Sequence, residues 1–378
     1  MVFLKSRRSR IIVDSSVLVG SWGGISRITQ QLTVALREVA TGCRVTEASP
    51  HVLKVGPFEC LDTLLSSLNY LYRYIIWSQI VLPIRCIVSG AKVIIAPNFV
   101  IPMVLAKRTV PIIHDIGHRD YSGGGVLCLY KWWVELNIRV ALLCSPVVVV
   151  PSHYVKLDIT RHYSHRADIV VIPWAVSSSL SFGAEPMISS ELRYKLPKMF
   201  VLAVGTLPRK RIEFLTDVIS DLRSNLDIEL VVVGPVDDSM VARESLPGFV
   251  HFIGMVTDSE LAVLYREASA LAMAGVIEGF GIPALEAMAA GCPVVVSNAG
   301  SLPEVVGSAG IVVSAESIDE WSAGLFSLVS DESTRNGCIR RGKEWVREYN
   351  WKTSARKLVV CLLKHGLVSL DSVSSDIS

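Results

Sequence analysis

Two glutamates, Glu278 and Glu286, stand at the ends of the segment Glu-Gly-Phe-Gly-Ile-Pro-Ala-Leu-Glu, a pattern typical of a glycine turn that opens a helix. Gly279 and Gly281 let the backbone approach a ligand closely and leave N–H groups accessible. Amides at a helix amino end attract anions such as phosphate, whereas the two carboxylates suit hydrogen bonds from sugar hydroxyls. The segment therefore indicates a site for a phosphorylated sugar. The alternative is that both glutamates are solvated residues at an ordinary turn.

The residues on either side predict the elements that hold this turn. Residues 269–274 are small and apolar and predict a buried strand, so the turn lies at a strand's carboxyl end, where open α/β sheets bind ligands. Pro283 suits the first helical position, because its φ is preset and its missing N–H costs nothing there. Gly291 is expected to end this helix about two turns later.

Two further helices are predicted to begin with a capping box. Thr257 and Glu260 have the required spacing, and Ser301 and Glu304 repeat it. In such a box the side chain of each member bonds the backbone N–H of the other. These four residues are therefore interpreted as structural rather than catalytic.

A cluster of cations forms a second candidate site. After a predicted buried strand at residues 200–204, Gly205 opens a tight turn that carries Arg209, Lys210 and Arg211 and leads into a helix. Cations at such a turn suit a diphosphate. The alternative is a solvated basic turn.

The run that begins at Glu278 resembles the family 4 glycosyltransferases, which are retaining enzymes of the GT-B architecture. The family's order continues through residues 291–297, 301–307 and 309–310, and its pattern covers nearly the whole chain. The resemblance implies an α/β fold with two Rossmann-like, doubly wound domains facing a central cleft. It also implies that Glu278 contacts the hydroxyls of the donor sugar and that Glu286 contacts the ribose of the nucleotide.

The resemblance assigns further residues to the donor. Family members place an arginine and a lysine on the leaving phosphates, which implies this role for Lys210 with Arg209 or Arg211 beside it. Other positions are expected to contact the base, the sugar or the diphosphate mainly through the backbone: Gly205, Gly254, Met255, Phe280, Gly281 and Ile282.

Several positions depart from the family's pattern. Thr206 stands where many relatives carry arginine, and its loop is one residue shorter than the common form. Ala274 and Gly275 replace proline and serine, His153 replaces a glutamate, and Trp174 replaces an asparagine. The resemblance assigns no role to the altered side chains.

A glycine pair and a histidine mark the amino-terminal half. Gly23 and Gly24 follow a short predicted strand that ends at Asp14, and they resemble the family's first glycine loop, which faces the acceptor. His114 and Asp115 follow another predicted strand, and relatives use this histidine at the reaction centre. An imidazole can donate a hydrogen bond to a sugar hydroxyl or carry a proton near neutral pH, and Asp115 would orient it or contact the acceptor. The alternative is a buried, satisfied histidine and a turn aspartate.

His114, Lys210 and Glu278 are thus the expected catalytic residues. The implied reaction is the retaining transfer of a hexose, with mannose favoured, from a nucleotide diphosphate sugar to a lipid-linked or growing polysaccharide, as in O-antigen assembly. Guanosine diphosphate mannose is the favoured donor. Two alternatives remain open, namely a phosphorylase or epimerase on the same architecture, and a non-catalytic GT-B subunit that activates a partner enzyme.

Composition and patterning predict two domains. The chain has 378 residues, of which 51% are hydrophobic, enough for two separate cores. Predicted strands alternate with helices, which indicates parallel sheets. We expect an acceptor-side domain at residues 1–180, a linker at 181–197, the nucleotide-sugar domain at 198–345, a last helix at 346–366 that crosses back to the first domain, and a frayed tail at 367–378.

Several ligand classes are disfavoured. A net charge of +2 is too small to suggest nucleic acid binding. No G-x-G-x-x-G motif is present, so we expect no dinucleotide cofactor. No D-x-D triplet is present either, and we expect no metal site, because cations and a helix amino end would neutralise the leaving diphosphate.

The expected location is the cytoplasm, with peripheral contact at the inner face of the plasma membrane. Residues 74–106 form the most apolar region, but Arg85 and Lys92 interrupt it, whereas a spanning helix needs about 20 apolar residues. The eight cysteines are scattered, which is typical of reduced core thiols, and no signal peptide is expected. An exposed apolar face for the membrane is expected from Trp77, Ile80, Val81 and Leu82.

Overall fold

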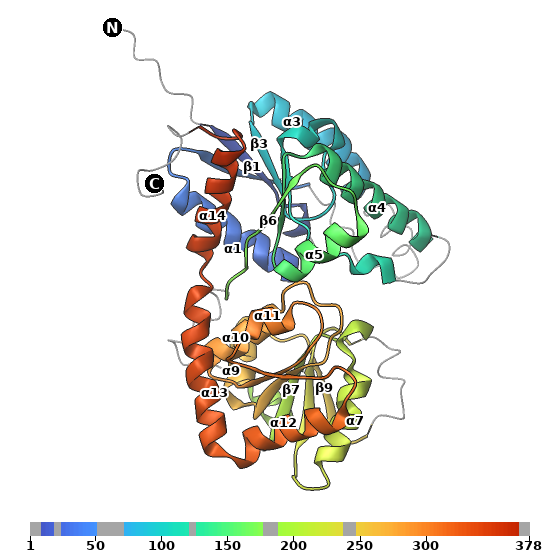
Figure 1. The fold of residues 1–378 in the computed structure, drawn as a ribbon, viewed down its shortest axis with the longest axis vertical. Helices are drawn as coiled ribbons and strands as arrows, with labels where there is room; N and C mark the ends of the chain where they lie inside the picture. The colour runs from blue at the N-terminus through green and yellow to red at the C-terminus, as the bar shows by residue number, and fades with distance from the viewer. Residues whose placement is uncertain are drawn as a thin grey trace. The chain divides into compact units, whose positions relative to one another are not determined.

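The computed structural model describes residues 9–18, 24–50, 72–120, 126–176, 188–236 and 247–369. The chain divides into two compact units (Figure 1). The first unit comprises Met1–Trp174 and Trp351–Ser378, and the second comprises Ala175–Asn350. Each unit contains a parallel β-sheet with helices packed against it.

The first unit is built on a four-stranded parallel sheet in the order β2-β1-β3-β4. A bridge between Ile112 and Val149 continues this sheet into the parallel pair β5-β6. Because all strands run in the same direction, their carboxyl ends lie along one edge. The strands are β1 (Arg10–Asp14), β2 (Arg44–Ala48), β3 (Val93–Ala96), β4 (Thr109–Pro111), β5 (Val147–Val150) and β6 (Asp168–Val171).

The helices of the first unit include the amphipathic helix α1 (Gly24–Val39). Its core-facing residues are buried, among them Leu32, Ala35, Leu36 and Val39. The others are the π-helical segment η2 (Tyr72–Val81), α3 (Leu82–Ser89), α4 (Val126–Cys144), α5 (His153–His162) and α14 (Trp351–Lys364). Short turns are η1 (Ser16–Leu18), η3 (Met103–Arg108) and η4 (Gly117–Asp120).

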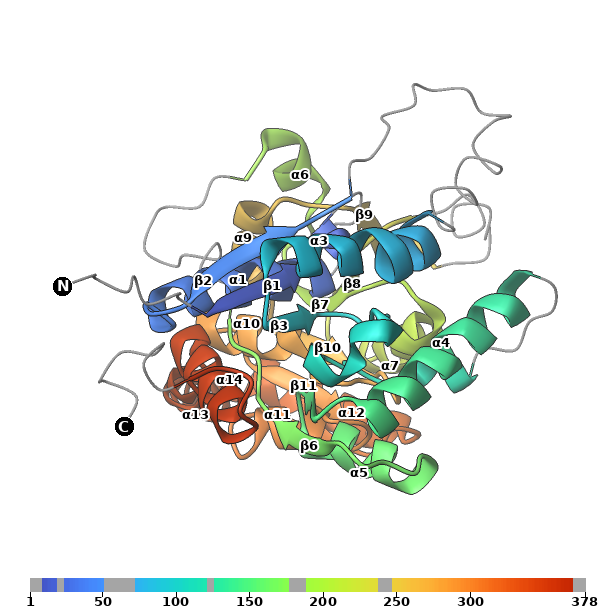
Figure 2. The ribbon, with the colours of Figure 1, turned by 90° about the horizontal axis from the view of Figure 1, so that it is seen from above.

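Segment η2 and helix α3 cover β1 and β3, as Figure 2 shows. Trp77 and Leu82 are fully buried in this contact, and the Trp77 Nε1–H donates a 3.0 Å hydrogen bond to Asp14 Oδ1. The predicted exposed face of Trp77, Ile80, Val81 and Leu82 is therefore wrong. The bulky side chains cover the sheet, Val81 is half-buried, and Ile80 is exposed.

The second unit is built on a six-stranded parallel sheet in the order β12-β11-β10-β7-β8-β9. The chain proceeds from β7 outward to β9 and then returns to β10 on the other side of β7. The strand order therefore switches between β7 and β10, the place where open α/β sheets bind ligands. The strands are β7 (Phe200–Val204), β8 (Glu229–Val233), β9 (Val250–Gly254), β10 (Ala270–Met273), β11 (Val294–Ser297) and β12 (Ile311–Val313).

Helices cover this sheet so that its four inner strands, β11, β10, β7 and β8, are largely buried. Leu215 of α7 and Trp321 of α12 pack in one core with Val201 and Leu230 of the sheet, and α9, α10 and α13 pack together (Figure 1). The helices are α6 (Ser190–Lys195), α7 (Ile212–Leu222), α9 (Asp258–Glu267), α10 (Ile282–Ala290), α11 (Leu302–Val306), α12 (Ile318–Ser330) and α13 (Glu332–Trp345). Short turns are η5 (Pro208–Lys210) and η6 (Val346–Glu348).

The unit boundaries differ in position from those expected from the sequence. The first unit ends at Trp174 rather than at residue 180, and helix α6 lies within the segment 181–197 that was expected to be a linker. The last helix, α14, packs against α1 of the first unit, where Lys352 pairs with Glu38 at 2.9 Å. Of the expected frayed tail, residues 370–378 lie outside the described residues.

The two predicted capping boxes have different outcomes. The box of Thr257 and Glu260 is confirmed at the start of α9. The box of Ser301 and Glu304 is wrong, because the Ser301 side chain makes no capping bond. Its hydroxyl instead donates a 2.8 Å hydrogen bond to the carbonyl of Glu278.

Six cysteines carry free thiols: Cys43, Cys86, Cys144, Cys292, Cys338 and Cys361. All of these except Cys144 are buried. None of the described helices has both the length and the hydropathy of a membrane span.

Candidate active site

Two loops of the second unit meet at the switch point between β7 and β10. The first runs from Gly205 to Arg211 after β7, and the second runs from Ala274 to Gly281 after β10. The predicted buried strand before the second loop is confirmed, since all four residues of β10 are buried. Because β7 and β10 are hydrogen-bonded neighbours, both loops emerge at the same edge of the sheet.

The two loops are joined by an ion pair between Lys210 and Glu278. Lys210 Nζ lies 2.7 Å from Glu278 Oε2, and the side chains are only 15% and 13% exposed, respectively. The alternative that Glu278 is a solvated surface residue is therefore excluded. The pair concentrates a cation and a carboxylate in one place that is partly shielded from water.

Glycines and a serine fix the position of Glu278. A Cβ on Gly300 would lie 2.9 Å from both the nitrogen and the carbonyl oxygen of Glu278, and one on Gly275 would lie 3.2 Å from the Arg209 carbonyl oxygen. The backbone N–H of Ser301 also donates to the Glu278 carbonyl at 3.0 Å. Only residues without a side chain permit this close approach.

Helix α10 presents its amino end in the second loop. Gly281 is its N-cap with a left-handed φ of 93°, and the predicted stop at Gly291 is confirmed by a left-handed C-cap. Within the part of the chain that the structure describes, the N–H groups of Phe280, Gly281 and Ile282 have no hydrogen-bond acceptor. These amides can therefore receive an anion or a sugar oxygen. The Phe280 ring is buried and lies 6.0 Å from the Tyr349 ring.

The other two cations of the first loop are placed differently from Lys210. Arg211 donates hydrogen bonds to the Ala315 carbonyl at 2.7 Å and to Glu316 at 2.9 Å, and its guanidinium lies over the Phe214 ring. Its side chain is thus occupied within the fold. Arg209 belongs to the η5 turn, with its carbonyl close to Gly275.

Glu286 is buried within α10. Its residue surface is 1% exposed, and Oε2 accepts a 3.1 Å hydrogen bond from the Tyr265 hydroxyl of α9. The alternative of a solvated residue is therefore excluded for Glu286 as well. The ribose contact stays a prediction.

The remaining donor-side positions lie at the same sheet edge. Gly205 has a left-handed φ of 101°, and a Cβ there would touch the Lys210 side chain at 3.0 Å. Thr206 is buried and donates a 2.6 Å hydrogen bond to the Pro235 carbonyl, so it fastens this loop to the one after β8. Gly254 is the last residue of β9, and the next residue, Met255, is 59% exposed.

In the first unit, His114 lies just beyond the carboxyl end of β4. Its Nε2 is 2.8 Å from the Pro97 carbonyl, which follows β3. Because a carbonyl only accepts, Nε2 carries the proton, and Nδ1 of the neutral ring is left as an acceptor. Burial lowers the pKa of His114 below its usual 6.5, although the Pro97 contact and the charge of Asp115 oppose this shift.

Asp115 and the glycine pair complete the predicted acceptor-side residues. Asp115 Oδ1 accepts a 3.0 Å hydrogen bond from the Gly117 N–H, which shapes the turn after His114. Gly24 is the first residue of α1, whereas Gly23 lies outside the described residues.

Residues 187–345 match the family described as glycosyl transferases group 1. The matched segment contains both loops at the switch point. Residues 187–345 of this chain therefore form a group 1 glycosyltransferase domain.

Individual relatives of this glycosyltransferase support the same assignment. It is 29% identical to O-antigen chain mannosyltransferase B of Escherichia coli over 70% of this chain and 72% of the relative. It is 31% identical to a GDP-mannose-dependent alpha-(1-6)-phosphatidylinositol monomannoside mannosyltransferase of Mycobacterium tuberculosis, over 57% of this chain and 60% of the relative.

Solved structures share the fold. Sucrose-phosphate synthase from Thermosynechococcus elongatus superposes with a TM-score of 0.70, at 20% identity, over 95% of this chain and 99% of that chain. Together with the two parallel α/β units, this likeness confirms the GT-B fold class predicted from the sequence.

Sequence reasoning missed several residues that position the site. Gly300 and Ser301 hold Glu278, and Trp174 packs between His114 and Trp351, with ring centroids 5.7 Å and 6.0 Å away. Trp174 stands where the family has asparagine, so the departure itself was a signal. For Gly300 the only signal was a glycine directly before Ser301.

Gly300→Ala should destabilise the second unit of the glycosyltransferase. A left-handed alanine costs about 1–2 kcal/mol, and displacing the Glu278 backbone should cost about 1–3 kcal/mol more. Gly254→Ala is the matched control, because Gly254 also has a positive φ, 76°, but a Cβ there would meet nothing within 4 Å. Urea and thermal unfolding of both variants would measure the difference. Equal losses would show that Gly300 is not sterically required.

Acid should inactivate the glycosyltransferase through His114. Its folded pKa lies below the unfolded 6.5, so the neutral ring's contribution to stability is fully present above pH 6.5 and is lost as pH falls through the lowered folded pKa. We expect kcat/KM to fall in acid with a midpoint below 6.5, and the same midpoint for the His114 ring signals in an NMR titration. A ring that titrates above 6.5 would contradict this.

Proposed function

We propose that this glycosyltransferase transfers mannose from a nucleoside diphosphate sugar, with guanosine diphosphate mannose as the favoured donor, to a lipid-linked or growing glycan. The observation that carries the proposal is the Lys210–Glu278 pair beside the open amides of α10. The pair and the amides supply charge and hydrogen bonds for a diphosphate and for sugar hydroxyls at one place. The mannosyltransferase names of the relatives favour mannose, and one of those names specifies GDP-mannose.

In the proposed reaction, bond breaking leaves negative charge on the nucleoside diphosphate. Lys210 and the amides of Phe280, Gly281 and Ile282 stabilise this charge as it grows. Glu278 accepts hydrogen bonds from the sugar hydroxyls and orients the ring. The acceptor oxygen then attacks from the face that the leaving group vacates, which retains the anomeric configuration. Its hydroxyl proton passes to the departing phosphate.

His114 is proposed to act on the sugar or on the acceptor through Nδ1. Since Nε2–H is committed to the Pro97 carbonyl, the neutral ring accepts a hydrogen bond from a hydroxyl rather than donating one. The lowered pKa keeps the ring neutral near pH 7. Asp115 and Gly24 are proposed to lie on the acceptor side.

We expect the reaction to need no metal ion. The sequence contains no D-x-D triplet, and Lys210 supplies positive charge where the loops after β7 and β10 meet. Activity should persist in excess chelator. Activity that disappears with chelator and returns with manganese or magnesium would contradict this prediction.

A donor screen tests the proposed function. The full chain would be incubated with guanosine, uridine and adenosine diphosphate sugars, and both sugar transfer and donor hydrolysis would be followed by release of the nucleoside diphosphate. We expect turnover of the mannose donor. NMR should show that the product retains the anomeric configuration of the donor. Turnover confined to another sugar would overturn the mannose assignment, and a product of inverted configuration would overturn retention.

We further propose that the enzyme works in the cytoplasm, attached peripherally to the inner face of the plasma membrane. The M. tuberculosis relative acts, by its name, on a phosphatidylinositol mannoside. Exposed apolar residues on the first unit of this chain also favour contact with a membrane.

A further inference from the structure

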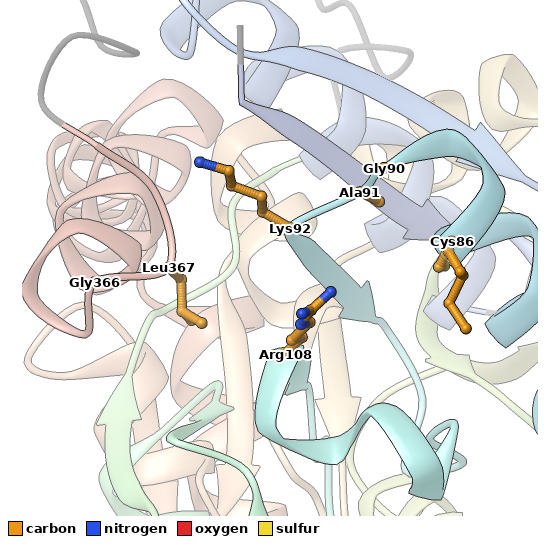
Figure 3. A pocket seen from close by; sticks show the side chains of 8 residues that line it. Cys86, Gly90, Ala91, Lys92, Arg108, Gly366 and Leu367 are labelled. Carbon is orange, nitrogen blue, oxygen red and sulfur yellow. The ribbon is translucent and has the colours of Figure 1, made fainter. Parts of the chain in front are cut away.

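A pocket of about 500 Å³ lies in the first unit, at the amino ends of β3 and β4. Figure 3 shows Lys92, which precedes β3, and Arg108, which precedes β4, with Leu367 and Cys86 on opposite sides. The other lining residues are Ile87, Gly90, Ala91 and Gly366. His114 follows the carboxyl end of β4, so the pocket and the candidate active site lie at opposite ends of that strand.

The two cations of the pocket are uncompensated. Neither the Lys92 ammonium nor the Arg108 guanidinium makes an ion pair or hydrogen bond with another residue of the described ranges. No acidic residue lines the pocket. The sequence from 63 to 114 contains no aspartate or glutamate, and its cations are Arg73, Arg85, Lys92, Lys107 and Arg108. An anion would therefore meet attraction without a competing carboxylate from this segment.

An exposed apolar stripe adjoins the pocket. It consists of Ile80, Ile84, Ile87 and Val88, which are 53%, 55%, 63% and 82% exposed, respectively. Ile84, Ile87 and Val88 have the spacing of one helix face, and Ile87 also lines the pocket. Val104 of η3, four residues before Arg108, is 76% exposed. A free anion in water would need no such apolar surroundings.

We propose that this pocket binds the phosphate of an anionic membrane lipid while the apolar stripe enters the interface between headgroups and acyl chains. Cations beside apolar side chains match an anionic bilayer, because the lipid presents negative charge directly above hydrocarbon. Lys92 and Arg108 bind the phosphate oxygens, and Arg108 offers its planar fork of N–H donors. The inference rests on the proposed membrane attachment and defines its surface; it is independent of the donor sugar.

Vesicle sedimentation of the full chain tests the proposal. Vesicles of phosphatidylcholine alone would be compared with vesicles that also contain phosphatidylglycerol. We expect binding to the anionic vesicles only. Since each cation near such a surface contributes about fivefold, Lys92→Ala with Arg108→Ala should weaken binding about 25-fold. Ile87→Ser with Val88→Ser should also weaken it.

A control variant removes the same charge elsewhere in the first unit. Arg356 and Lys357 are exposed on α14 and have no ion pair within the described ranges. Arg356→Ala with Lys357→Ala should retain most of the binding. Equal losses of vesicle binding in the two double variants would overturn the assignment of the pocket as the lipid site, because they would show that only net charge matters.

Inorganic phosphate separates the lipid from a free anion. Thermal melts in phosphate and in chloride of equal ionic strength should coincide. Stabilisation by phosphate that depends on Lys92 and Arg108, without vesicle binding, would overturn the lipid assignment in favour of a soluble anion. Normal sugar transfer to a soluble acceptor without vesicle binding would also overturn the inference, together with the proposed membrane attachment, while leaving the proposed sugar transfer intact. Vesicle binding without sugar transfer would overturn the proposed sugar transfer and leave the inference intact.

Discussion

Lys210→Ala should lower turnover about 100- to 1000-fold, because a preorganised cation aimed at developing charge is commonly worth that factor. Lys210 Nζ lies 2.7 Å from Glu278 Oε2, where the loops after β7 and β10 meet. The Lys210 side chain is 15% exposed, so water screens its charge little. The diphosphate gains charge as the glycosidic bond breaks, so the contact is stronger in the transition state than in the ground state. Steady-state kinetics should therefore show a large fall in kcat and a modest change in donor affinity.

The control for Lys210→Ala must separate chemistry from folding. Removing one partner of a largely buried ion pair leaves the other uncompensated and destabilises the fold, so thermal melts must accompany the kinetics. Lys195→Ala is a suitable comparison, since this exposed lysine of α6 pairs with exposed Glu191 and with no other acidic residue in the described ranges. Turnover of Lys210→Ala close to that of Lys195→Ala, with both variants folded, would show that Lys210 is structural.

Glu278→Gln should lower the rate about 10- to 100-fold, the range expected for lost hydrogen bonds to a charged group. It should also weaken discrimination between donor sugars. The glutamine keeps the shape of the side chain that Gly275 and Gly300 accommodate, but it loses the charge that pairs with Lys210. Binding of the free nucleoside diphosphate should stay near normal, because the carboxylate acts on the sugar.

Competition among donor sugars measures how well Glu278→Gln discriminates between them. The ratios of kcat/KM for mannose and glucose donors with the same base should converge in Glu278→Gln. Unchanged ratios, with a reduced rate, would mean that Glu278 acts only by holding Lys210. Wild-type rates and ratios would show that the ion pair is structural.

Much of the second unit was predictable from local sequence. Residues 200–204 and 269–274 are short apolar runs typical of buried strands, and they contain β7 and β10. Gly281 and Gly291 mark the ends of α10, because glycine alone adopts their left-handed backbone without strain. The capping box of Thr257 likewise depends on neighbours three residues apart.

The types of the functional side chains could be predicted from the sequence, but their contacts could not. Arg209, Lys210 and Arg211 are adjacent cations, yet Lys210 pairs with Glu278, whereas Arg211 binds the Ala315 carbonyl and Glu316. The sequence did not distinguish Lys210 from Arg211, because the partner of each side chain lies far along the chain and is brought near only by the fold.

By itself, the sequence determined the α/β class, the alternation of strands and helices, and the two loops that carry the chemistry, because these depend on patterns within a few residues. Only the tertiary structure decided that β7 and β10 are neighbours and that Lys210 meets Glu278 across 68 positions of sequence. It also decided that Trp77 is buried and Ile80 exposed. The physical reason is that strand order and buried face are chosen by the free energy of packing the whole core, to which no short segment contributes enough to decide alone.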